Sequence, residues 1–147
     1  MTTIAWDGRT LAADSLGVLG DSLKVVSHKL MCFPDGRLLG CCGRMSDKML
    51  VCEWLLHGGE KPLLDDSFAA ILVEPTGQAF RLEESLVFIT MHEPFHACGS
   101  GRDFAIAAMA LGKTACEAVA LAMQFDPWTG GAVEWLTLKE ESRGEYV

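Results

Sequence analysis

The residue that follows the initiator methionine has a side chain suited to covalent catalysis. Thr2 carries a hydroxyl group, which is a weak nucleophile until a base removes its proton. Because Thr2 is small, Met1 is expected to be removed, and the free α-amine of Thr2 would then be such a base, since its usual pKa of about 7.7–8.0 lies near neutral pH. The alternative is an ordinary threonine in a β-strand, where this residue type is common.

Five short motifs follow one another along the chain around this candidate nucleophile. They are Met1-Thr2-Thr3-Ile4-Ala5-Trp6 with Leu11-Ala12-Ala13-Asp14-Ser15, Lys29-Leu30-Met31-Cys32-Phe33, Gly40-Cys41-Cys42-Gly43-Arg44-Met45-Ser46-Asp47, Cys98-Gly99-Ser100-Gly101 and Asp126-Pro127-Trp128-Thr129-Gly130-Gly131. In type and order they resemble proteasome β-subunits and the bacterial proteasome-like (HslV-like) peptidase, which are N-terminal-nucleophile hydrolases. The resemblance implies a four-layer αββα sandwich formed by one domain over residues 1–147. It also implies a threonine-type endopeptidase that forms an acyl-enzyme on Thr2.

The resemblance assigns roles to three further residues near the nucleophile. Lys29 would place a cation beside Thr2 and lower the pKa of its amine, and Asp14 would pair with Lys29. The backbone N–H of Gly43 would stabilise the oxyanion of the tetrahedral intermediate. By residue type alone, Lys29 could be a surface lysine, Asp14 a turn residue at a strand end, and Gly43 a simple strand-to-helix turn.

Ser100 and the loop at Asp126 would orient the Thr2 amine, by the same resemblance. Ser100 would hydrogen-bond the amine, with Asp126 and Thr129 behind it. Alternatively, Ser100 is the N-cap of the helix that begins near residue 102, and Asp126 forms an Asx-type turn. Two residues depart from the family pattern: Thr129 replaces the usual serine but keeps the hydroxyl, and Pro127 follows Asp126.

The resemblance also implies a pocket for the substrate residue that precedes the scissile bond. Its lining would be Ser27, Met31, Cys41 and Met45. Most of these side chains are apolar, which predicts a preference for apolar substrate residues. The alternative for Met31 and Met45 is that both are plain core residues.

The hydrophobic pattern predicts the elements that must position these residues. Extended segments are expected within residues 2–6, 10–14, 24–33, 37–42, 68–73, 78–82, 86–90, 95–98 and 132–138, and helices over 45–57, 104–111 and from Thr114. Asp7-Gly8 is a hairpin turn signal, and Thr114 with Glu117 has the spacing of a capping box. Strands followed by a helix pair favour an α+β layered domain. The charged tail from Lys139 is expected to fray.

The composition limits the kinds of binding partner and the cellular compartment that are expected for this chain. The chain has 147 residues, half of them hydrophobic, with 12 basic and 20 acidic residues and a net charge of −8. These values favour a globular domain and disfavour nucleic acid or an anionic membrane as partner. No segment resembles a signal peptide or a membrane span, so a cytoplasmic location is expected.

The cysteines and histidines do not form a recognisable metal motif. The six cysteines are Cys32, Cys41, Cys42, Cys52, Cys98 and Cys116, and none forms a CxxC pair. Reduced, buried thiols are predicted. His92 and His96 are separated by Pro94, which disfavours a helical metal pair. No metal or other cofactor is predicted.

Two functions compete with the peptidase. One is a catalytically inactive ring or scaffold subunit, and the other is an N-terminal-nucleophile amidase that acts on a small-molecule amide. The resemblance implies a homo-oligomeric ring and a peptide or unfolded protein substrate. The sequence has no ATP-binding motif, so an ATPase unfoldase would be a separate chain.

Overall fold

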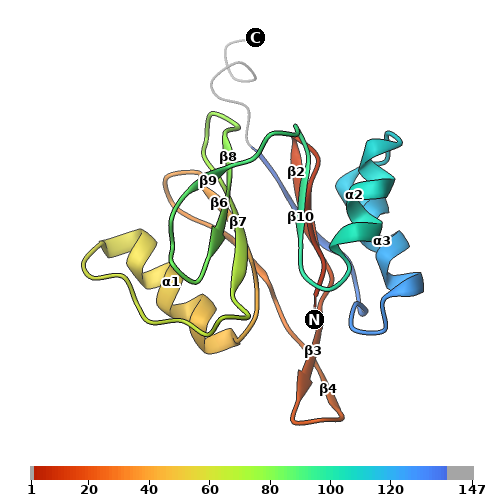
Figure 1. The fold of residues 1–147 in the computed structure, drawn as a ribbon, viewed down its shortest axis with the longest axis horizontal. Helices are drawn as coiled ribbons and strands as arrows, with labels where there is room; N and C mark the ends of the chain where they lie inside the picture. The colour runs from red at the N-terminus through yellow and green to blue at the C-terminus, as the bar shows by residue number, and fades with distance from the viewer. Residues whose placement is uncertain (1, 139–147) are drawn as a thin grey trace.

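The structure is a computed structural model that describes residues 2–138, and its elements form four layers. Two antiparallel sheets pack face to face in the middle, α1 covers the outer face of one sheet, and α2 and α3 cover the outer face of the other (Figure 1). This is the αββα order expected from the sequence. The α+β prediction is confirmed.

The first sheet contains the start of the chain. Its strand order is β10 (His96–Cys98), β1 (Ile4–Trp6), β2 (Thr10–Ala13) and β11 (Glu134–Thr137). The predicted hairpin joins β1 to β2, with Asp7 Oδ1 accepting the backbone N–H groups of Arg9 and Thr10 at 2.9 and 2.8 Å. Because β1 lies between β10 and β2, Thr2 enters the sheet at a central position.

The second sheet has five strands and a single helix on its outer face. The strand order is β5 (Leu30–Cys32), β6 (Leu38–Cys42), β7 (Ala69–Val73), β8 (Ala79–Glu83) and β9 (Ile89–Thr90). Every residue of β6 and β7 is buried, as expected for strands covered on both faces. Helix α1 (Met45–His57) follows β6 after a two-residue connection.

The other two helices cover the first sheet. They are α2 (Arg102–Ala110) and α3 (Ala115–Phe125). The capping box predicted at the start of α3 is confirmed: Thr114 accepts the Glu117 N–H at 3.2 Å, and the Glu117 side chain accepts the Thr114 N–H at 3.0 Å.

Three apolar clusters fill the three interfaces between the layers. Alternation along β1 directs Ile4 and Trp6 to the other sheet and Ala5 to the helices. The cluster under α2 and α3 consists largely of alanine, and small side chains let the helices approach the sheet closely. Val51 and Cys52 of α1 pack on the outer face of the second sheet. The layer order therefore follows from which face of each strand is apolar.

Two strand predictions differ from the structure. The single strand expected within residues 24–33 is two strands, β4 (Leu23–Val26) and β5, and β4 pairs with an unpredicted strand, β3 (Leu16–Leu19). This hairpin extends away from both sheets (Figure 1). The segment expected to be extended from residue 86 begins only at Ile89, because Leu86 has a φ of 57° and is buried in a turn.

Several expectations concern the chain as a whole. The tail from Lys139 lies outside the described residues. Among residues 2–138, no helix combines the length and the apolar character that crossing a bilayer requires. The same residues contain no group of three His, Cys, Asp or Glu side chains arranged to hold a metal ion. All six cysteines are free thiols, four of them buried, whereas Cys32 is exposed.

Candidate active site

A buried ion pair lies beside the N-terminal strand. The Lys29 ammonium is 2.8 Å from Asp14 Oδ1, and the two side chains are 7% and 0% exposed. Asp14 also accepts backbone N–H groups from Thr3 at 3.0 Å and from Gly130 at 3.0 Å. A buried carboxylate requires such partners. Asp14 therefore joins the ends of β1 and β2 to the loop that precedes β11.

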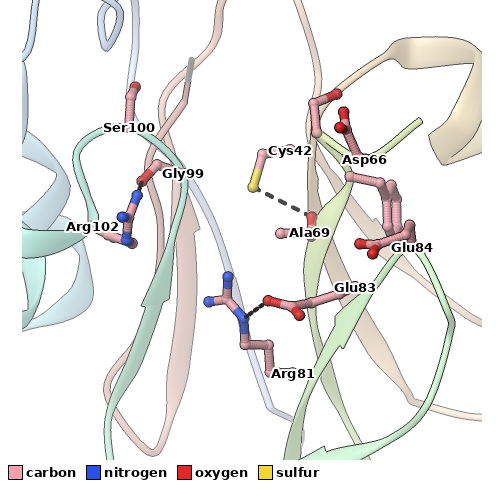
Figure 2. A pocket seen from close by; sticks show the side chains of 11 residues that line it. Cys42, Asp66, Ala69, Arg81, Glu83, Glu84, Gly99, Ser100 and Arg102 are labelled. Atoms are coloured by element: carbon pink, nitrogen blue, oxygen red, sulfur yellow. Dashed lines mark hydrogen bonds and ion pairs between the residues drawn. The ribbon is translucent and has the colours of Figure 1, made fainter. Parts of the chain in front are cut away.

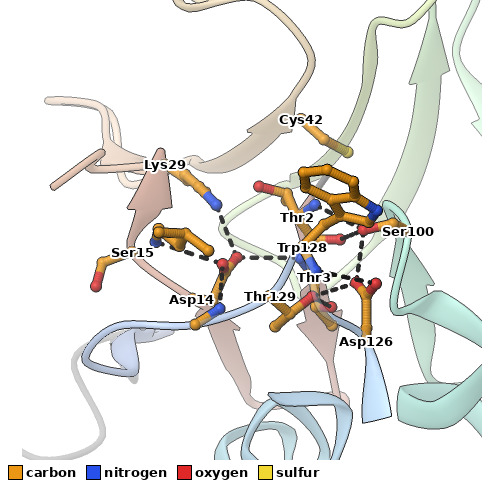
Figure 3. A network of polar contacts seen from close by, with 12 residues as sticks. Thr2, Thr3, Asp14, Ser15, Lys29, Cys42, Ser100, Asp126, Trp128 and Thr129 are labelled. Atoms are coloured by element: carbon orange, nitrogen blue, oxygen red, sulfur yellow. Dashed lines mark hydrogen bonds and ion pairs between the residues drawn. The ribbon is translucent and has the colours of Figure 1, made fainter. Parts of the chain in front are cut away.

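A second polar chain reaches Thr2 from the opposite side. The Thr2 backbone N–H donates to Ser100 Oγ at 3.0 Å, and Ser100 Oγ donates to Asp126 Oδ2 at 2.6 Å (Figure 3). Because the Ser100 proton is directed at Asp126, the lone pairs of Ser100 Oγ are available to the Thr2 nitrogen. Ser100 thus fixes the position of that nitrogen between the two sheets.

Asp126 is held by three donors. Its Oδ2 accepts the hydroxyls of Ser100 and Thr129, the latter at 2.5 Å, and its Oδ1 accepts the Trp128 N–H at 3.3 Å. Burial raises the pKa of Asp126, but these hydrogen bonds outweigh burial and lower the pKa below its usual value of 3.8. Asp126 is therefore a carboxylate at neutral pH.

The pKa shift of Asp126 predicts a pH-dependent contribution to stability. A carboxyl group whose pKa is lower in the folded chain stabilises the fold above pH 3.8, and this stabilisation is lost as the pH falls through the lower folded value. We expect Asp126→Asn to lower the free energy of unfolding by about 1–3 kcal/mol at pH 7 and by progressively less in more acidic solution. Urea unfolding at a series of pH values checks this.

Asp103 offers a matched control for that measurement. Its side chain is 89% exposed, so Asp103→Asn should change the free energy of unfolding little at any pH. A destabilisation by Asp126→Asn that stays constant from pH 7 to pH 3 would contradict the prediction.

Glycine is required where the loop before α2 passes Thr2. Gly99 has a φ of 99°, and a methyl group at its Cα would lie 2.0 Å from the Thr2 carbonyl oxygen. The Gly101 N–H donates to that same oxygen at 3.3 Å. The backbone of Thr2 is therefore held on both its nitrogen and its carbonyl by the Gly99-Ser100-Gly101 segment.

A pair of glycine substitutions tests this close approach. Gly112 also has a positive φ, 92°, but nothing lies within 4 Å of an added methyl group. Gly112→Ala should cost only the backbone term, about 1–2 kcal/mol. Gly99→Ala should cost about 1–3 kcal/mol more because it adds a steric overlap. Urea unfolding of both variants measures the difference, and equal losses would contradict the prediction.

A small pocket opens next to Thr2. It has a volume of about 30 Å³ and is lined by Thr2, Ser27, His28, Lys29, Cys41, Cys42, Gly43, Arg44, Met45 and Lys48. Gly43, with a φ of 108°, lies against the Phe68 backbone, where a side chain would be 3.1 Å from Cα. The pocket therefore brings three of the predicted catalytic residues together: Thr2, Lys29 and Gly43.

The structure places three of the four predicted substrate-binding residues in this pocket and the fourth outside it. Ser27, Cys41 and Met45 line this pocket, and Met45 is 56% exposed, so it is not a core residue. Met31 is not among the lining residues. It packs, partly buried, against the core cluster between the second sheet and α1, which agrees with the alternative that it is a plain core residue.

A larger pocket adjoins the site on the Ser100 side. It has a volume of about 420 Å³ and shares Cys42 with the small pocket. Figure 2 shows Asp66, Glu83 and Glu84 on one wall and Arg102 on the other. Thr2 lines the small pocket and Ser100 lines the larger one, so the Thr2–Ser100 hydrogen bond joins a residue of each.

The structure excludes one alternative role of Ser100, and sequence reasoning missed one residue. Ser100 is not the N-cap of α2: the N-cap is Gly101, without a side-chain cap, and the Ser100 hydroxyl contacts Thr2 and Asp126 instead. Thr3 was not predicted. It is fully buried, and its hydroxyl lies 2.8 Å from that of Thr129. Strand alternation was the available signal, since it points Thr3 away from the face of Thr2.

Known structures share this fold. The structure of Thiobacillus denitrificans BPH superposes with a TM-score of 0.70 at 18% sequence identity, covering 95% of this chain and 99% of that one. The same protein in complex with epoxomicin gives 0.69 at 18% identity. Eukaryotic HslV from Trypanosoma brucei gives 0.70 at 19% identity, with the same coverage. The fold is thus that of HslV and bacterial proteasome-like structures, as the resemblance implied.

The sequence comparisons found no relative. No protein-family model matches the chain, and no curated protein matches it significantly.

Proposed function

We propose that this chain is a threonine-type endopeptidase that cleaves peptide bonds through an acyl-enzyme on Thr2, after removal of Met1. The fold it shares with HslV and BPH supports a proteasome-type peptidase at a coarse level. The observation that carries the finer proposal is the setting of Thr2. Its nitrogen contacts Ser100 Oγ at 3.0 Å, and Thr2 lines one pocket with Lys29 and Gly43.

In the proposed first step, the Thr2 amine acts as general base. Ser100 accepts an N–H from the amine and so leaves its lone pair free for the Thr2 hydroxyl proton. The Lys29 cation favours the neutral form of an amine nearby, and its pairing with buried Asp14 holds it in place. The Thr2 oxygen then attacks the substrate carbonyl carbon.

The remaining steps use the same groups. Negative charge develops on the carbonyl oxygen, where the Gly43 N–H is the proposed donor. The tetrahedral intermediate collapses, the C–N bond breaks, and the ammonium formed from the Thr2 amine protonates the leaving amine. Water, deprotonated by the same amine, then attacks the ester carbon. The bond from that carbon to the Thr2 oxygen breaks, the ammonium returns its proton to this oxygen, and the acid product leaves. This cycle needs no metal.

The inactive scaffold subunit is the second candidate. The ion pair Lys29–Asp14 and the Thr2–Ser100–Asp126 chain favour catalysis over it, because they surround Thr2 with the cation and the hydrogen-bond acceptor that the proposed mechanism uses. A homo-oligomeric ring, a separate ATPase unfoldase and a cytoplasmic location belong to this proposal as further expectations from the resemblance. A small-molecule amide is the alternative substrate.

Intact-mass spectrometry tests the proposal. The purified protein is measured before and after treatment with an electrophilic peptide that carries alanine next to its electrophile. We expect the mass without Met1, and one added inhibitor that peptide mapping assigns to Thr2. Retention of Met1, or no adduct on a chain that begins at Thr2, would count against catalysis and favour the scaffold. Comparing peptide with small-amide hydrolysis separates the peptidase from the amidase.

A further inference from the structure

The small pocket beside Thr2 is lined by basic side chains. His28, Lys29, Arg44 and Lys48 contribute to its wall, and no aspartate or glutamate does. These residues come from the connection between β4 and β5 and from the beginning of α1. The polarity differs from the apolar lining that the sequence predicted.

The basic side chains of the pocket differ in whether an acidic side chain balances their positive charge. Lys29 is neutralised by buried Asp14, and Arg44, 68% exposed, lies 3.3 Å from Asp65. Lys48 donates to the His28 backbone carbonyl oxygen and, within residues 2–138, has no carboxylate within 4.0 Å. Lys48 is therefore a partly exposed lysine on the pocket wall, and no carboxylate of the described chain pairs directly with its ammonium group.

The start of α1 adds to this potential. Arg44 is the N-cap residue, its side chain makes no capping hydrogen bond, and Met45 begins the helix at the pocket wall. The N-terminus of a 13-residue helix carries partial positive charge. Asp47, buried in the first turn, already offsets part of this helix potential. An anionic group in the pocket would therefore interact favourably chiefly with Lys48 and Arg44.

The size of the pocket restricts its occupant. A water molecule needs about 10–15 Å³ of open volume, so a pocket of about 30 Å³ favours a small side chain. Aspartate is smaller than leucine or phenylalanine, because its carboxylate oxygens replace bulkier methyl or ring groups. The basic lining then favours an acidic side chain among the small ones.

We propose that this pocket binds an acidic side chain, aspartate in preference to glutamate, on the substrate residue that precedes the scissile bond. Lys48 is the principal specificity-determining residue, and Arg44 assists it. This inference rests on the proposed peptidase function, because the pocket selects a substrate residue only if Thr2 attacks the adjacent carbonyl.

Peptides that differ only at that residue test the proposal. We measure kcat/KM for fluorogenic peptides with aspartate, asparagine, glutamate or leucine before the cleaved bond. Asparagine has the shape of aspartate without its charge, so the aspartate-to-asparagine ratio isolates the electrostatic effect. We expect a ratio of about 10 that falls as salt concentration rises. A ratio of one or less, or leucine as the best residue, would overturn the proposal.

Substitutions of the basic residues test which of them cause the preference for aspartate over asparagine. Lys48→Met should lower the aspartate-to-asparagine ratio to about 3, and combining it with Arg44→Gln should bring it close to one. Because both substrates are measured on the same protein sample, partial unfolding cancels in the ratio. Lys113→Met, in the turn between α2 and α3, is the matched control and should keep the wild-type ratio. An unchanged ratio in the double variant would overturn the assignment.

Failure of the peptidase and failure of the specificity give different results. Labelling of Thr2 by the alanine-containing electrophile with an aspartate-to-asparagine ratio near one would reject only the acidic preference. No labelling and no hydrolysis of any peptide would reject the proposed function, and the specificity with it.

Discussion

Thr2→Ala should abolish peptide hydrolysis and leave the fold almost unchanged. We expect kcat/KM to fall by about 10³-fold or more, as for loss of the nucleophile in other acyl-transfer enzymes. The hydrogen bonds of Thr2 to Ser100 and Gly101 use its backbone nitrogen and carbonyl oxygen, and alanine keeps both. The free energy of unfolding should therefore change by no more than about 1 kcal/mol.

Thr2→Ser is the matched control, because it keeps the hydroxyl group and removes only the methyl group. It should retain activity within about tenfold of the wild type and should still be labelled by the electrophilic peptide. Measuring hydrolysis, labelling and urea unfolding on the three proteins separates the two roles of Thr2. Residual labelling of Thr2→Ala at the wild-type rate would show that another group is the nucleophile.

Lys29→Met should damage both stability and activity. The substitution leaves the Asp14 carboxylate fully buried without its counter-charge, and breaking a buried ion pair in this way costs about 3–5 kcal/mol. Activity should fall by at least about 100-fold, because the Thr2 amine would lose the cation that favours its neutral form. Urea unfolding and peptide hydrolysis measure the two effects.

The double variant Asp14→Asn/Lys29→Met distinguishes structure from catalysis. It removes both charges, so most of the lost stability should return through the coupling between neighbouring sites. Activity should stay low, because the Lys29 ammonium is absent from this variant as well. Recovery of activity along with stability would contradict the catalytic role of Lys29 and leave it a purely structural one.

Local sequence patterns predicted the elements whose cause is local. The Asp7-Gly8 turn and the capping box of Thr114 and Glu117 each depend on hydrogen bonds between residues two or three positions apart. The continuous apolar run Leu38–Cys42 is likewise a local pattern, and it is typical of a strand covered on both faces, as β6 is. The β3–β4 hairpin was missed because Leu16–Leu19 is short and contains Gly17, although Gly20-Asp21-Ser22 is a turn signal.

The site depended on contacts that no local pattern encodes. Serine before α2 is a good N-cap by propensity, but the 98 residues that separate Ser100 from Thr2 hide the bond that its hydroxyl makes instead. The basic lining of the small pocket could not be predicted either, because it depends on a contact between Lys48 and the carbonyl oxygen of His28, which lie 20 positions apart in the sequence. Neither contact can be predicted from the spacing of residues along the sequence.

The sequence by itself determined the kind of chemistry available and the α+β class, since a threonine next to Met1 and the hydrophobic pattern of strands and helices are properties of short segments; the αββα layer order was implied by the resemblance. Only the tertiary structure decided which groups meet at Thr2. Burial leaves Asp14 and Asp126 few partners, and packing of the two sheets selects Lys29 for one and Ser100 with Thr129 for the other. An unpaired buried charge is strongly destabilising. Each buried carboxylate is therefore paired with groups from distant parts of the sequence.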